Sequence, residues 1–270
     1  MCNEIRCGYW CIRRYGAKYS GLSCKTGLLC FSLDKNIGSA KENVLPIEVD
    51  LTNIESIKSA FEKVNSITES IFAIIHFAGM YKLDSLLEMN ERELKQIFDV
   101  NLFGAIYVNK IFFPLLKKGS RIIITTSELA PLNPLPFTGI YAITKSALDN
   151  YAFSLRMEMQ LLGIHVSVLR AGAVSTQMLG VSTQALDDFC ERSCLYKCNA
   201  ERFRSIVNRV EAKNISPTKI AFKVAKIIEK KSPKFAYSIN RNKLLILLSI
   251  LPKSLQFYVI KKVLQNKKQT

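Results

Sequence analysis

The sequence predicts an α/β fold, a doubly wound parallel sheet of the Rossmann-like kind. From residue 44 onward, short apolar runs alternate with amphipathic stretches. The apolar runs show little polar alternation, which is typical of strands buried on both faces. Strand–helix alternation of this kind implies right-handed crossovers and a parallel sheet. Such sheets bind ligands beyond the carboxyl ends of their strands.

The expected strands are short apolar runs that end in polar residues or glycine. The run "IFAIIHFAG" is apolar almost throughout and ends in glycine, and "RIIITTS" ends in three hydroxyl side chains. Both histidines fall in expected strands. The strands are expected at 28–34, 44–50, 71–79, 121–127 and 164–170.

The expected helices carry apolar residues at helical spacing. In the first of them, Ile54, Ile57, Phe61 and Val64 share one face. The second opens with Asn90 as N-cap and has a glutamate three residues later, which is a capping-box pattern. Helices are expected at 52–64, 90–116, 141–162 and 216–231.

Size and composition favour one domain spanning residues 1–270. The chain is 49% hydrophobic, enough for a sizeable core, and its net charge is +16. Residues 201–270 hold seventeen Lys and Arg but only three Glu. A basic segment of this kind either binds an anionic surface or forms a solvated helical face. Nucleic acid is not expected as a partner, because basic and aromatic residues do not interleave.

The eight cysteines are interpreted as free thiols of a cytoplasmic protein. No apolar leader region occurs in residues 1–27. Cys190, Cys194 and Cys198 are spaced four apart, but a metal site would need a fourth ligand, so no metal is expected. No apolar run approaches the roughly 18 residues of a membrane span. The apolar run 244–251, with the basic stretch after it, leaves open a peripheral membrane contact, a cover over a substrate pocket or simple packing.

Three polar residues suggest redox chemistry. Ser127 ends an expected strand, Tyr141 follows fourteen residues later at a helix start, and Lys145 lies one turn beyond. A phenol has a pKa near 10, and a nearby ammonium favours its ionised form. Such a tyrosine can exchange a proton with an alcohol or carbonyl oxygen that a serine hydroxyl holds. This proton transfer would accompany hydride transfer with a nicotinamide.

At this point the sequence resembles the short-chain dehydrogenases/reductases, from about residue 44 to about 240. The motifs are "TTS" followed by "YAITK", then "FDVNLFG", "VDLTN", "HFAG" and "RAGAVST", each at the end of the expected element that should carry it. Two departures are small. Phe77 replaces an asparagine of the family's Asn-Asn-Ala-Gly segment, and Ala171 replaces the proline of Pro-Gly.

The resemblance implies roles for individual residues. Tyr141 would be the general acid/base, Lys145 would hold the nicotinamide ribose, Ser127 would position the substrate oxygen, and Asn101 would anchor a water in the proton relay. Without the resemblance, Asn101 is an ordinary buried polar group and Asp50 an ordinary turn residue. The implied cofactor contacts are Asp34, Asp50, Leu51, Ala78, Gly79, Tyr141, Lys145, Gly172, Val174 and Thr176.

The N-terminal segment, 1–33, departs from the family. The family opens with an apolar strand that runs into Thr-Gly-x-x-x-Gly-x-Gly, whose glycines admit the cofactor pyrophosphate. Counting back from the strand at 28–34 places the last Gly-x-Gly near "GYW", where Gly8 fits and Trp10 does not. The first strand is therefore expected to be missing or degraded. A reading-frame error near the start of the gene would explain this, and the DNA read in all frames tests it.

The expected function is an NAD(P)-dependent oxidoreductase that interconverts a secondary alcohol and a ketone on a steroid-, retinoid- or acyl-like substrate. The alternatives are a 3-oxoacyl reductase, or a catalytically silent or defective relative that serves as a binding or scaffold module. Asp34 slightly favours NAD, although the adjacent Lys35 leaves NADP open. Residues 177–215 are expected to form a substrate lid and 243–270 a basic, apolar C-terminal extension. The resemblance implies a homodimer or tetramer, paired through helices 90–118 and 141–162.

Overall fold

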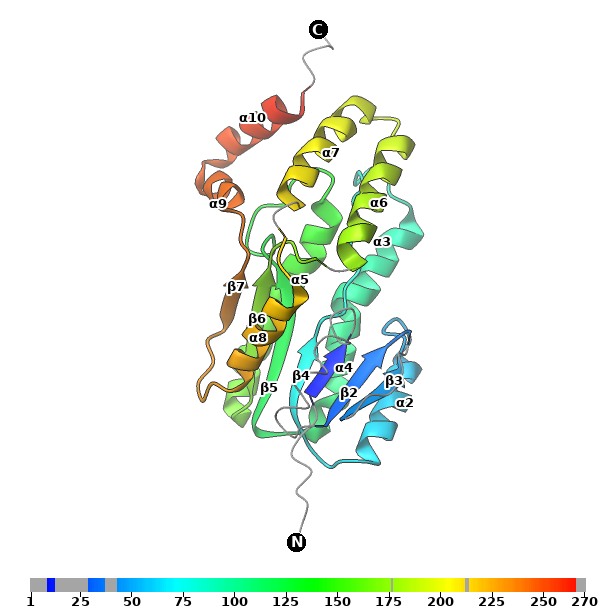
Figure 1. Cartoon of the computed structure of the whole chain (residues 1–270), viewed down its shortest axis with the longest axis vertical. Helices are drawn as coiled ribbons and strands as arrows, with labels where there is room; N and C mark the ends of the chain where they lie inside the picture. Colours follow the sequence, from blue (N-terminus) through cyan, green and yellow to red (C-terminus); the bar gives the residue numbers. More distant parts are fainter. Residues whose placement is uncertain (1–8, 13–28, 37–42, 176, 212–213, 266–270) are drawn as a thin grey trace.

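The computed structural model describes residues 9–12, 29–36, 43–175, 177–211 and 214–265. Its centre is a seven-stranded parallel sheet in the order β3-β2-β1-β4-β5-β6-β7 (Figure 1). The chain leaves β1 in one direction for β2 and in the other for β4, so the sheet has a topological switch point between β1 and β4. The strands are β1 (Tyr9–Ile12), β2 (Cys30–Asp34), β3 (Val44–Glu48), β4 (Ile71–His76), β5 (Leu116–Ser127), β6 (His165–Ala171) and β7 (Ala236–Ile239).

Helices join the strands and cover the sheet (Figure 1). Among the described residues they are α2 (Ile54–Asn65), α3 (Glu91–Phe98), α4 (Gly104–Phe112), α5 (Gly139–Met159), α6 (Gln177–Arg192), α7 (Lys197–Glu211), α8 (Pro217–Ile228), α9 (Lys243–Ile250) and α10 (Lys253–Leu264). Single 3₁₀ turns follow α4 and α5, at Phe113–Leu115 and Gln160–Leu162. The predicted α/β class and the parallel, doubly wound sheet are confirmed.

The core is divided between the two faces of the sheet. On one face, α2, α4 and α5 contribute Ile57, Val108 and Leu148 to the larger apolar cluster. On the other face, α8 contributes Ile220 and Val224 to a second cluster. The central strands supply side chains to both clusters because successive residues of a strand point to opposite faces. Their near-continuous apolar character is therefore explained by burial on both sides.

The first strand corrects one expectation from the sequence. Tyr9–Ile12 forms a short parallel strand between β2 and β4, so the first strand is present rather than missing. Trp10 is in register with Phe31 and Ile74, and it therefore belongs to the strand and not to a glycine loop. Gly8 and the segment 13–28, where a loop after this strand would fall, lie outside the described residues.

Helices α6, α7, α9 and α10 gather at one end of the molecule, beyond the carboxyl ends of the strands (Figure 1). The apolar cores of α6 and α7 meet loop residues from the same end, with Phe137 at the centre. The Phe137 ring lies 4.8 Å from that of Phe189 and 5.3 Å from those of Tyr196 and Phe203. The segment 177–215, for which a lid is predicted, consists largely of α6 and α7, which lie beyond the carboxyl edge of the sheet (Figure 1).

Candidate active site

Ser127 is the last residue of β5, which pairs with β4 and lies one strand away from the switch point. It is buried, and its hydroxyl oxygen accepts a hydrogen bond of 3.2 Å from the backbone N–H of Leu129. This bond fixes the turn that carries the chain away from the sheet. The position agrees with the prediction that Ser127 stands at the carboxyl edge.

Asn101 lies on a π-helical turn, Asp99–Phe103, that joins α3 to α4. Its side-chain oxygen accepts the N–H of Met80 at 2.6 Å, and its side-chain nitrogen donates to the Met80 carbonyl at 2.9 Å and to the Thr144 hydroxyl at 3.0 Å. Single π turns inside helices are frequent at functional sites. This one brings a fully buried amide against both the loop after β4 and the helix α5.

Tyr141 and Lys145 share one face of α5, one turn apart, and both are buried. The ammonium of Lys145 lies 5.9 Å from the centre of the Tyr141 ring. That ring also meets the edge of Tyr81, with centroids 4.7 Å apart. The Thr144 hydroxyl donates to the Tyr141 carbonyl at 2.8 Å, so Asn101 is linked to the helix turn that carries the tyrosine.

The Lys145 ammonium has three N–H donors and uses few of them within the described residues. Among the described residues its one hydrogen bond is a long contact of 3.5 Å to the Thr125 carbonyl oxygen, two residues before Ser127. Burial lowers the pKa of Lys145 from 10.5 to about 8. The Thr125 hydroxyl nearby on β5 is also buried without a hydrogen-bond partner in the described part of the chain. A buried cation with unused donors suits a ligand that brings hydroxyl oxygens.

Gly79 provides the open wall of this site. A Cβ atom at Gly79 would stand 3.1 Å from the Lys145 nitrogen and 3.6 Å from the Asn101 side-chain oxygen. A side chain here would crowd the ammonium and touch the amide, so glycine leaves the space beside the ammonium open. Half-buried Ala78 and Gly79 lie in the loop after β4, which ends at His76 and is shorter than the strand expected at 71–79. The residues present therefore fit a nicotinamide ribose next to Lys145.

The predicted adenine side is built by the ends of β2 and β3. Asp50 accepts hydrogen bonds from the Lys35 ammonium at 2.7 Å and from the Thr52 hydroxyl and backbone N–H. Partial burial acts against ionisation, but these bonds outweigh it and bring the pKa of Asp50 down to about 2. Leu51 packs against α4, where only a glycine at position 104 avoids a clash with the Leu51 Cβ. Asp34 ends β2, and its carboxylate accepts the N–H of Asn36.

The far end of the predicted cofactor site follows β6. The backbone N–H of Gly172 donates to the Ile239 carbonyl, and a Cβ at Gly172 would overlap the backbone of Asn240. The close approach of the chain after β7 therefore requires this glycine. Val174 is buried and forms an isolated parallel bridge with Ile215. Thr176 lies outside the described residues.

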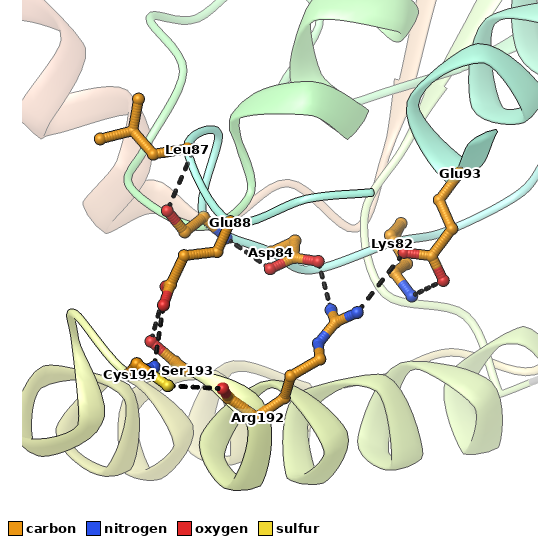
Figure 2. A network of polar contacts seen from close by, with 9 residues as sticks. Lys82, Asp84, Leu87, Glu88, Glu93, Arg192, Ser193 and Cys194 are labelled. Carbon is orange, nitrogen blue, oxygen red and sulfur yellow. Dashed lines mark hydrogen bonds and ion pairs between the residues drawn. The ribbon is translucent and has the colours of Figure 1, made fainter. Parts of the chain in front are cut away.

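Ion pairs fasten the end of α6 to the loop between β4 and α3 (Figure 2). Arg192 bonds the buried carboxylate of Asp84 and lies 3.6 Å from Glu93, which itself pairs with Lys82 at 2.7 Å. Burial raises the pKa of Asp84, and the charge of Arg192 opposes that rise.

The carboxylate of Glu88 binds the segment that connects the two lid helices. It accepts hydrogen bonds from the hydroxyl of Ser193 and the backbone N–H of Cys194 (Figure 2). It also accepts the backbone N–H of Leu195. With Asp84 it therefore holds both ends of the turn between α6 and α7 against the β4–α3 loop.

Two residues near the site were not predicted from the sequence. Glu128, directly after Ser127, is buried, and its carboxylate accepts the backbone N–H of Asn242. Burial raises the pKa of Glu128. Phe137 adopts a left-handed φ of 63°, which is uncommon for a bulky residue and is typical of functional sites. No pattern in the sequence marks either residue, because both depend on contacts with distant segments.

Comparisons with known proteins identify the family of the chain. A family model described as short chain dehydrogenase matches residues 29–187. Estradiol 17-beta-dehydrogenase 2 of Mus musculus is 29% identical over 157 residues, 57% of this chain and 41% of that protein. 3-Ketodihydrosphingosine reductase of Bacteroides thetaiotaomicron is 26% identical over 202 residues, 74% of this chain and 73% of that protein. The chain spans 41 to 59% of the length of several curated relatives that it matches.

Solved structures share the fold at low sequence identity. A short chain dehydrogenase/reductase from Burkholderia phymatum in complex with NAD gives a TM-score of 0.74, with 15% identity, over 95% of this chain and 97% of that one. A short chain dehydrogenase from Burkholderia cenocepacia J2315 in complex with NADP gives 0.70, with 19% identity, over 97% and 99%. Sheet order and helix placement are therefore common to these proteins.

Proposed function

Since the chain belongs to the short-chain dehydrogenase family, we propose that it interconverts a secondary alcohol and a ketone on a hydrophobic substrate. The proposed cofactor is NAD or NADP, which are the cofactors bound in two structures of the same fold. The proposal rests on the surroundings of the Lys145 ammonium. The ammonium is buried, poorly hydrogen-bonded within the described residues, and adjacent to Tyr141, Asn101 and Gly79.

In the proposed chemistry the cofactor transfers a hydride and the protein transfers a proton. The nicotinamide, when bound, exchanges a hydride with the carbon of the substrate carbonyl. In the reducing direction, the Tyr141 hydroxyl gives its proton to the substrate oxygen, and the Lys145 charge favours the phenolate that remains. The Ser127 hydroxyl holds the substrate oxygen. The Asn101 amide fixes the Met80 backbone, on the loop that also carries Gly79 beside the lysine. Its proposed role is to anchor, in this part of the site, the water of the proton relay.

A hydrophobic substrate is supported by the surroundings of Tyr141. Met80, Tyr81, Met89 and Leu129 pack against the buried cluster that contains Tyr141. Helices α6 and α7 add a further apolar cluster centred on Phe137. Apolar side chains beside the reacting group suit an apolar substrate. The relatives named for estradiol and 3-ketodihydrosphingosine are consistent with a steroid- or acyl-like molecule. A 3-oxoacyl substrate is the runner-up within the same chemistry.

We favour NAD over NADP because of the charges at the end of β2. Asp34 would approach the ribose hydroxyls, and its charge would repel a phosphate there. Lys35, the basic residue that could have neutralised a phosphate, pairs with Asp50 at 2.7 Å. The test is the ratio of kcat/KM for the two cofactors in the protein and in Asp34→Ser. The substitution should shift the ratio toward NADP by roughly tenfold or more; an unchanged ratio would contradict this role of Asp34.

A homodimer or tetramer paired through the segments 90–118, which holds α3 and α4, and 141–162, which holds most of α5, is part of the proposal. Phe153, Met157 and Leu161 are exposed at successive i, i+4 positions of α5 and its terminal turn, which gives one apolar stripe. Sedimentation of the protein and of Met157→Glu tests this pairing, with loss of the oligomer expected in the variant. We expect a cytoplasmic protein, which fractionation of cells would test.

The deciding experiment combines cofactor titration with Tyr141→Phe. NADH or NADPH fluorescence should show saturable binding in both proteins, while turnover of hydrophobic ketones falls at least about a hundredfold in the variant. Tyr107→Phe, a half-buried tyrosine of α4, is the matched control and should keep full turnover. Failure of both proteins to bind either nucleotide would instead support the catalytically silent alternative.

A further inference from the structure

The last two helices, α9 and α10, form a C-terminal arm, residues 243–264, that is fixed to the body at several points. The buried side chain of Gln256 donates to the carbonyls of Leu251 and Ser249 and accepts from the Asn133 side chain at 3.0 Å. At the tip, Asn199 of α7 donates to the Leu264 carbonyl at 2.8 Å. The arm therefore has a defined orientation and a defined outer face.

The first helix of the arm is apolar on opposite sides. Leu245 and Leu248 face inward and line a small cavity with residues of the 129–135 loop. Leu244, Leu247 and Ile250 face outward, and 73%, 61% and 74% of their surfaces are exposed. A helix that is apolar all round is normally buried all round. The outer face of α9 thus indicates a second apolar partner.

The second helix combines exposed aromatic residues with lysines. Phe257 and Tyr258 are 70% and 58% exposed. Lys261 and Lys262 follow one turn later, and the Lys262 ammonium lies 5.8 Å from the centre of the Tyr258 ring. Aromatic residues next to lysines are characteristic of helices that lie at the boundary between lipid head groups and acyl chains.

Charge and length identify the partner. The described stretch 241–265 contains five basic residues and no acidic residue. The two helices have eight and twelve residues, whereas about twenty are needed to cross a bilayer. Among the described residues no helix is long and apolar enough for a membrane span. Lysine is also depleted at the centre of protein–protein interfaces, which argues against a second copy of the chain as the occupant.

We propose that the C-terminal arm binds the surface of an anionic lipid bilayer, with the outer apolar residues in the acyl boundary and the lysines at the head groups. This property goes beyond the redox chemistry and does not depend on it. The N-cap of α9, Asn242, is bonded to Glu128, the residue after Ser127. The base of the arm is therefore bonded to the residue next to the candidate active site.

Co-sedimentation of the full chain with vesicles tests the proposal. We expect binding to vesicles of about two parts phosphatidylcholine to one part phosphatidylserine, and much weaker binding to phosphatidylcholine alone. Salt should weaken the binding because part of it is electrostatic. The measurement needs no cofactor or substrate, so its failure is independent of a failure of the proposed enzyme activity.

Two kinds of variant separate the apolar from the charged contribution. Leu247→Glu and Phe257→Glu should each reduce the partition constant roughly tenfold or more, because each removes a large buried side chain from the lipid. Lys261→Gln and Lys262→Gln should each reduce it roughly fivefold, and only on anionic vesicles. Ile67→Glu, an exposed apolar residue between α2 and β4, is the matched control and should leave binding unchanged.

Two outcomes would overturn the proposal. Absence of binding to both kinds of vesicle at low salt contradicts it outright. A concentration-dependent dimer that Leu247→Glu dissociates, without any vesicle binding, would assign the outer face to a second copy of the chain. Circular dichroism of each variant confirms that the fold is intact before either conclusion is drawn.

Discussion

The side-chain amide of Asn101 and the backbone of Met80 form a closed pair of hydrogen bonds, 2.6 Å to the N–H and 2.9 Å to the carbonyl. The pair joins the π turn before α4 to the loop that follows β4. Because that loop also carries Gly79, which lies against Lys145, the amide fixes one wall of the candidate active site. Its loss should affect both stability and activity.

We expect Asn101→Ala to lower the free energy of unfolding by about 1–3 kcal/mol, since it leaves polar groups of the Met80 backbone without partners. Turnover and the affinity for cofactor should also fall, because the wall beside Lys145 is no longer fixed. Urea denaturation and steady-state kinetics measure the two effects. Asn150→Ala is the matched control, because Asn150 is exposed on α5 and bonds a single carbonyl. Equal effects of both substitutions would refute the special role of Asn101.

Lys145 should make stability depend on pH in the alkaline range. Its pKa is about 8 in the folded protein against 10.5 for the free side chain, so the unfolded chain binds more protons between these values. Stability should therefore rise from pH 8 toward pH 10.5, by up to about 3 kcal/mol. The difference in unfolding free energy between the protein and Lys145→Met isolates this contribution.

The control for Lys145 is Lys110→Met, which removes an exposed lysine of α4. Its unfolding free energy should follow that of the unmodified protein across the same pH range. If Lys145→Met and the unmodified protein show the same pH dependence above pH 8, the lysine is not desolvated as the structure indicates.

Arg192 should control how tightly the lid helices close. Removing it in Arg192→Gln leaves the Asp84 carboxylate buried without its cation, which costs about 1–3 kcal/mol given that the arginine is half exposed. Limited trypsin digestion should then cut the 177–215 segment faster, and the KM for substrate should rise. Arg204→Gln disrupts a pair with Asp187 that is exposed on both sides and should have a small effect. Similar digestion rates for the two variants would count against the anchoring role.

His76 should make the protein sensitive to acid. Its ring is buried and bonded to Asn109 at 2.7 Å, and burial lowers its pKa from 6.5 to about 4. The folded state therefore resists protonation that the unfolded chain accepts. The contribution of His76 to the free energy of unfolding has its full value above pH 6.5. It should fall by up to about 3 kcal/mol as the pH drops to 4. The unfolding free energy of His76→Gln should lack this decline, and a decline of the same size in the variant would disprove the assignment.

The local patterns of the sequence predicted most elements of the sheet and the helices that follow its strands. The apolar run at 71–79 and the run that ends in Ser127 needed no distant contact to be recognised, because burial on both faces demands apolar side chains at every position. Asn90 was likewise predicted as an N-cap, and its side chain accepts the N–H of Arg92. The glutamate of the same pattern, Glu93, instead pairs with Lys82, since a partner from another loop competes for its carboxylate.

The N-terminal strand shows the limit of counting along the chain. Spacing from the second strand placed Trp10 in a glycine loop, whereas the register with Phe31 and Ile74 places it inside β1. A four-residue strand with mixed polarity has too little pattern to be recognised alone. Only pairing with its neighbours on both sides defines it.

Short-range periodicity and spacing were sufficient to predict the fold class and the polar residues at the carboxyl ends of the strands. The surroundings of those residues depend on folding. A π turn directs Asn101 to Met80, and Gly79 leaves space beside the Lys145 ammonium. The buried carboxylate of Asp84 pairs with an arginine 108 residues away. Burial and charge pairing depend on atoms brought together by folding, and these have no signature in the order of the residues along the chain.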